Sequence, residues 1–146
     1  MSTPSSVRFD PAVLQRLRSY VSTHPGLSTS GAANQLVDEA LRSREHPLVI
    51  FRDGAMGRRA RLAAGPDVWE VVQALRSAQR SEPDLSAEKL VELVADTGGL
   101  ATGMVRAALA YWADYPEEID ALLEAVDAAV DKAQVRWRRE RELLSG

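Results

Sequence analysis

A short polar–apolar alternation near the N-terminus places two hydrogen-bonding side chains on one side of an extended segment. In residues 5–9, Ser6 and Arg8 alternate with Val7 and Phe9, which is the pattern of a half-buried β-strand. An arginine can donate two parallel hydrogen bonds to the edge of a guanine, and a serine hydroxyl can donate or accept one. These two side chains are therefore candidates for reading DNA bases; the alternative is an exposed strand that binds no ligand.

Two helices are predicted directly after this strand. Asp10 is a typical N-cap, Pro11 suits the first helical position, and a serine-rich connector precedes the second helix. Near Ser28, Thr29 and Ser30, the backbone N–H groups at the start of that helix can bind a DNA phosphate, and Ser28 or Ser30 is the expected cap. The apolar residues expected to form a common core are Val7, Phe9, Leu14, Leu17, Leu36, Val37 and Leu41.

A module of one strand and two helices, residues 1–46, is too small to bury these apolar faces alone. Two copies would pair their strands antiparallel and pack four helices around one core, so we predict a homodimer and leave assembly beyond the dimer open. Two paired strands make a ribbon that fits the major groove of DNA. Residues 1–46 are therefore predicted to be a dimerisation and DNA-binding module, with operator DNA as the partner.

Residues 4–43 resemble the ribbon-helix-helix family of repressors and antitoxins. The matching segments are the strand at 6–9, the helix start Asp10-Pro11, the connector at 26–30 and the apolar stripe at 36–41. The resemblance implies that the outward strand residues contact bases, a role that falls on Ser6 and Arg8, with Pro4 at the outermost place. Pro4 departs from the family, where that place usually holds a long polar side chain.

The charge of the chain is unevenly distributed. The net charge is −3, but residues 1–65 hold nine arginines against five carboxylates, and residues 66–146 hold nine cations against sixteen carboxylates. This asymmetry favours an anionic partner for the first part and a different partner for the second; uneven scatter in a short chain is the alternative. With only 5% aromatic residues, the core must rest on Leu, Val and Ala, which favours helices.

The rest of the chain is predicted to hold one β-hairpin followed by helices. The hairpin is expected over residues 47–62, with its turn at 52–54, inside a linker that spans 47–65. Residues 66–146 are predicted to be a helical domain with a polar loop at 77–85. One helix is expected to pack through Leu90, Leu93 and Val94 and to stop at Gly98-Gly99. A second helix is expected at 101–112, and a last helix begins at Pro116 and frays or projects at 136–144. The three tryptophans, Trp69, Trp112 and Trp137, are expected in the core.

Residues 57–125 resemble a catalogued family of small helical antitoxins, domain-of-unknown-function family 433. The matching segments are Gly65-Pro66-Asp67-Val68-Trp69, Leu85-Ser86, residues 105–112 and residues 115–120. The resemblance implies a helix-turn-helix-like bundle that pairs with a ribonuclease toxin of the PIN-like type. An acidic surface suits the basic cleft of a ribonuclease. The predicted partner-binding residues are therefore Glu117, Glu118, Asp120 and Glu124, and the alternative is a solvated helix face.

These patterns predict a mainly α protein with a ribbon-helix-helix module, a hairpin linker and a helix-turn-helix-like bundle. The expected function is a DNA-binding antitoxin that represses its own operator and neutralises a PIN-like toxin. The alternative is a stand-alone dimeric transcriptional regulator whose C-terminal domain senses a ligand or oligomerises. Whether the helix at 101–112 also contacts DNA is left open.

No residue set predicts an enzyme, a cofactor or a metal site. His24 and His46 flank prolines and lack the spacing of metal ligands, and the chain contains no cysteine. Residues 1–9 lack the features of a signal peptide, and no apolar run reaches the length that spans a membrane. A cytoplasmic location is therefore expected.

Overall fold

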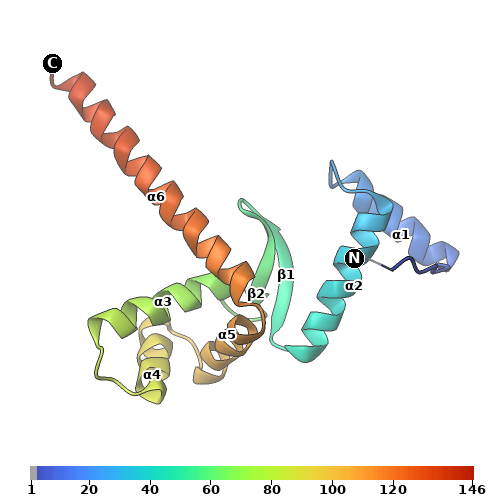
Figure 1. The fold of residues 1–146 in the computed structure, drawn as a ribbon, viewed down its shortest axis with the longest axis horizontal. Helices are drawn as coiled ribbons and strands as arrows, with labels where there is room; N and C mark the ends of the chain where they lie inside the picture. Colours follow the sequence, from blue (N-terminus) through green and yellow to red (C-terminus); the bar gives the residue numbers. More distant parts are fainter. Residues whose placement is uncertain (1–2) are drawn as a thin grey trace. The chain divides into compact units, whose positions relative to one another are not determined.

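The computed structural model describes residues 3–146, and the chain is mainly helical, as predicted. It divides into two compact units, Met1–Glu45 and His46–Gly146 (Figure 1). Among the described residues, no helix is both long enough and apolar enough to cross a membrane.

The first unit contains helices α1 (Pro11–Ser22) and α2 (Thr29–Glu45). Asp10 is the N-cap residue of α1 and Pro11 opens it, as predicted. Ser28 caps α2, because its Oγ accepts a hydrogen bond of 3.0 Å from the Gly31 N–H. The prediction that Ser28 or Ser30 caps this helix is therefore confirmed for Ser28.

The strand predicted for residues 5–9 is not formed in this single chain. Residues 3–10 have no regular secondary structure, and the strands of the described residues, β1 and β2, pair with each other. A β-strand is stabilised by hydrogen bonds to a neighbouring strand, and residues 3–45 of the first unit offer only helices. The two-stranded ribbon thus stays a prediction about two copies of the chain.

The second unit begins with an antiparallel hairpin of β1 (Val49–Gly54) and β2 (Gly57–Leu62). The predicted hairpin is confirmed, but its turn was placed too early. The chain reverses over Ala55 and Met56, whereas residues 52–54 belong to β1. Gly57 follows the turn with φ of 89°, a conformation open to glycine, and this explains the later position.

Four helices follow the hairpin: α3 (Val68–Ser81), α4 (Ala87–Gly98), α5 (Thr102–Asp114) and α6 (Pro116–Leu144). The loop predicted at 77–85 is wrong in its first part, because α3 continues to Ser81. The polar residues there form the exposed face of its last turn. Gly99 ends α4 with φ of 64°, so the predicted stop is confirmed.

The core of the second unit lies between the hairpin and the helices. The hairpin predicted as a linker contributes Val49, Ala60 and Leu62 to this core. The other buried side chains come from the helices: Val68, Val71, Val72, Leu75, Val91, Val94, Ala95, Val105, Ala108, Tyr111, Ile119 and Leu123.

Helix α4 faces this core with a different side from the predicted one. Val91, Val94 and Ala95 are buried, whereas the predicted Leu90 and Leu93 are only half-buried. Because residues 90, 91, 93, 94 and 95 are all apolar, helical periodicity allows two neighbouring stripes. The packing against α3 and α5 decides between them.

Helix α6 extends far beyond the core that anchors its first turns (Figure 1). Ile119 and Leu123 are buried, but every side chain from residue 127 onward is exposed. The charged end at 136–144 remains helical as far as Leu144 and projects. Trp69 and Trp112 pack against the core, but Trp137 is 56% exposed, so its predicted core position is wrong.

Candidate functional site

The predicted DNA-contacting side chains lie on the surface of the first unit. Pro4, Ser6 and Arg8 are exposed in the segment before α1. Thr29 and Ser30 are exposed in the first turn of α2, directly after the capping Ser28. The candidate base-reading and phosphate-binding residues therefore occupy two separate elements, and both sets face solvent.

The first unit leaves most of its predicted core in contact with water. Leu17 is buried, but Val7 is 70% exposed, Val37 is 56% exposed and Leu41 is 57% exposed. Phe9, Leu14 and Leu36 are half-buried. Burying one such aliphatic side chain stabilises a protein by roughly 1.5–3 kcal/mol. A single copy of this unit therefore leaves a large part of its predicted apolar core unburied and lacks the stabilisation that burial would give.

A polar contact joins the two helices of the first unit. The Gln35 amide donates a hydrogen bond of 3.4 Å to the Tyr20 hydroxyl, which links α2 to α1. The His24 ring stacks on Tyr20 with 3.9 Å between ring centroids, and its Nδ1 lies 2.7 Å from the Tyr20 carbonyl oxygen. His24 therefore packs on the C-terminal end of α1 and contacts a backbone carbonyl there.

The excess of arginine in residues 1–65 belongs largely to the hairpin. The first unit itself holds five arginines against four carboxylates. In the hairpin, Arg59 Nε donates to the Asp67 carboxylate, Arg58 lies 3.5 Å from Asp53, and Arg61 Nε donates to the Gly65 carbonyl at 3.1 Å. These arginines bind groups of the hairpin and of the segment that follows it. The cations of the first unit are therefore only its own five arginines, and Arg8 is one of them.

Two of the four predicted partner-binding carboxylates are engaged inside the second unit. Asp120 accepts hydrogen bonds from Arg76 at 2.8 Å and from the Trp112 indole at 3.1 Å. Glu118 accepts one from the Tyr111 hydroxyl at 2.5 Å. Glu117 and Glu124 are exposed on α6. A partner that binds this acidic stretch therefore meets Glu117 and Glu124 as its most accessible charges.

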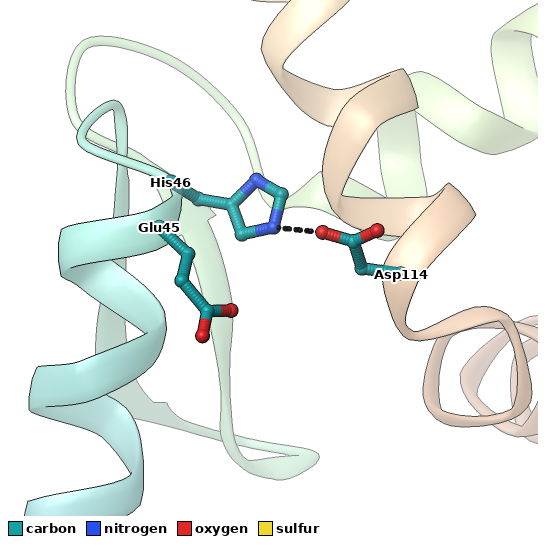
Figure 2. Close-up of side chains that lie close together, drawn as sticks. All are labelled: Glu45, His46 and Asp114. Atoms are coloured by element: carbon teal, nitrogen blue, oxygen red, sulfur yellow. Dashed lines mark hydrogen bonds and ion pairs between the residues drawn. The ribbon is translucent and has the colours of Figure 1, made fainter.

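The structure also reveals a contact between a buried histidine and an exposed aspartate that the sequence interpretation missed. His46 is only 8% exposed, and its Nε2 lies 2.7 Å from the Asp114 carboxylate (Figure 2). Its ring packs edge-on against Tyr111 and Tyr115 at centroid distances of 5.3 and 6.0 Å. An imidazole and a carboxylate are ligand types that zinc accepts. Here they bind each other and tie the start of the hairpin to the end of α5.

No local signal predicts this pair. His46 and Asp114 lie 68 positions apart, and each stands at the end of a helix, where polar residues are common. Only the packing of β1 against α5 brings them together.

No family model, curated protein or solved structure matches the chain.

Proposed function

We propose that this chain is a homodimeric DNA-binding repressor. The observation that carries the proposal is the exposed apolar surface of the first unit, above all Val7, Val37 and Leu41. A second copy would cover this surface, and pairing of residues 5–9 with those of the second copy would complete a two-stranded ribbon. The homodimer is thus the assembly that satisfies both the apolar faces and the unpaired backbone.

The side chains on the outer face of that ribbon supply the means to read DNA. Ser6 and Arg8 alternate with the apolar Val7 and Phe9, so pairing that buries the apolar pair turns the polar pair outward. Arg8 then reaches a guanine edge and Ser6 a neighbouring base in the major groove. Ser28, Thr29 and Ser30 would hold a phosphate at the start of α2 and position the ribbon.

We further propose that the second unit captures a protein partner and that the chain acts as an antitoxin. The support is the acidic first half of α6, where Glu117 and Glu124 are exposed on a helix that a partner can approach. A ribonuclease of the PIN-like type must bind RNA phosphates, so a cationic cleft on such a toxin would match these carboxylates. One chain then carries both functions: the first unit represses the operator and the second unit neutralises the toxin.

The proposed DNA reading is tested by selecting bound sequences from random duplex DNA and then changing Arg8. Arg8→Ala should weaken binding to the selected site by about 1–3 kcal/mol per lost base contact and relax the sequence preference. The mass of the dimer should not change, because the side chain points outward. Arg16→Ala, in an exposed part of α1, is the matched control and should retain the sequence preference. Unchanged affinity of Arg8→Ala would show that the ribbon is not the reading element.

A further inference from the structure

The projecting half of α6 carries an apolar seam that is exposed from Val130 onward, where the Arg141 guanidinium lies 4.8 Å from the centre of the Trp137 ring. The first row of the seam is Leu123, Val130, Trp137 and Leu144, and the second row is Ile119, Val126 and Ala133, followed by Glu140. This heptad spacing is typical of helices that pair along their length. Ile119 and Leu123 are buried in the core, but Trp137 is 56% exposed and Leu144 is 88% exposed. From Val126 to Leu144 the seam continues for about 27 Å.

A groove lies at the base of this seam. It has a volume of about 620 Å³ and is lined by Met56 from the hairpin turn, Trp69 from α3, and Leu122, Val126 and Val130 from α6. The groove shares its α6 face with the seam, because Val126 and Val130 belong to both. A helix that follows the seam toward the core therefore ends in an apolar groove.

The charges of α6 select the orientation of a pairing helix. Residues 117–131 contain six carboxylates and no cation, whereas residues 132–141 contain five cations and one carboxylate. A second α6 in parallel orientation would place like charges side by side. An antiparallel α6 places the basic stretch of one helix beside the acidic stretch of the other, so a second copy of this chain is itself a complementary partner.

We propose that α6 pairs antiparallel with α6 of a second copy. The seam rows then place Ala133 against the partner's Trp137, where the small side chain leaves room for the indole. In the same register, Val126 faces the partner's Leu144, so the end of each helix enters the groove of the other copy. On each flank Asp127 lies beside the partner's Arg141.

Two residues limit the strength of this pairing. Glu140 occupies a seam position, and Arg136 lies near its own counterpart at the two-fold axis. They stand four residues apart on one helix face, so each offsets the charge of the other. Glu117 and Glu124 lie outside the overlap, and the pairing depends on neither DNA binding nor toxin capture.

Disulfide cross-linking of the full chain tests the orientation and the register directly, because the chain has no cysteine of its own. Asp127→Cys and Arg141→Cys variants, mixed and oxidised, should form a cross-linked heterodimer. Each variant oxidised alone should stay uncrosslinked, since antiparallel pairing separates identical positions by roughly 21 Å and a disulfide needs Cα atoms within about 7 Å. Both positions are exposed, so the fold is retained.

The matched control is the mixture of Ala128→Cys and Glu142→Cys, which has the same spacing on the opposite face of α6 and should not cross-link. Adding Leu144→Glu to the reactive pair should lower the yield at least tenfold, whereas Val135→Glu, also apolar and exposed but off the seam, should leave it unchanged. Cross-linking of each variant with itself would place identical positions side by side, which the antiparallel register excludes, and would overturn the proposal. Equal yields from the seam and control mixtures, or none from either, would show that α6 does not pair with itself.

Discussion

The Asp120 carboxylate on α6 accepts a hydrogen bond of 2.8 Å from the Arg76 guanidinium on α3, and this contact fixes the first turns of α6 to the bundle. The same carboxylate accepts the Trp112 indole N–H at 3.1 Å, and the Arg76 guanidinium lies 5.0 Å from the centre of the Trp112 ring. Three helices, α3, α5 and α6, are therefore joined through one acidic side chain.

Asp120→Ala should lower the free energy of unfolding by about 1–2 kcal/mol, since it removes two hydrogen bonds at a half-exposed site. A double-mutant cycle with Arg76→Ala should give a coupling energy of about 0.5–1 kcal/mol in urea unfolding. Glu124→Ala, on an exposed position of the same helix, should change stability by less than about 0.5 kcal/mol. A coupling energy of zero would mean that the ion pair adds nothing to the attachment of α6.

His46→Ala should destabilise the second unit by about 2 kcal/mol, because it removes a buried ring that packs on two tyrosines and binds Asp114. Asp114→Asn should cost less, since the amide oxygen can still accept a hydrogen bond and this side chain is largely exposed. Urea unfolding followed by circular dichroism measures both. If the two variants match the stability of the natural chain, the pair has no structural role.

Leu41→Glu should abolish dimerisation through the first unit. A carboxylate placed in the expected dimer core would have to be buried without a partner, so the dissociation constant should rise at least about a hundredfold, or about 2.7 kcal/mol. The background should carry Leu144→Glu, which removes the proposed α6 pairing, so that sedimentation reports the first unit alone. Asn34→Glu, at an exposed position of α2 outside the apolar stripe at 36–41, is the control. A natural first unit that stays monomeric and folded at micromolar concentration in this background would contradict the dimer proposal itself.

Glu117→Lys and Glu124→Lys together should weaken capture of the ribonuclease partner about tenfold, with an effect that shrinks as salt is added. The candidate partner is the product of a neighbouring gene, tested by co-purification and titration calorimetry. The variant should lose only about 1 kcal/mol of stability, because both side chains are exposed and, of the two, only Glu117 lies in the first turn of α6, where a carboxylate favours the helix dipole. Glu82→Lys and Asp84→Lys together, exposed just after the end of α3, control for the same change in net charge. If the control weakens capture equally, the loss of binding comes from the net charge of the chain and not from Glu117 and Glu124.

The sequence by itself determined where most helices begin and end, because these signals act within one turn of the chain. Asp10-Pro11 opens α1, Pro116 opens α6, and Gly99 ends α4 with the positive φ that glycine tolerates. The hairpin was also predictable from its β-forming run and its glycines. The position of its turn was not, because two candidate glycines lie three residues apart and the pairing of β1 with β2 chooses between them.

Tertiary structure decided which side chains meet. His46 binds Asp114 across 68 positions and Arg76 binds Asp120 across 44, and nothing local to either residue signals its partner. The α4 stripe and the exposure of Trp137 were decided in the same way, since an apolar side chain is buried only where another element covers it. The strand predicted at 5–9 shows the physical limit most directly. Its alternation is a property of the sequence, but its hydrogen bonds require a neighbouring strand, and β1 and β2 pair with each other while the described residues of the first unit form only helices.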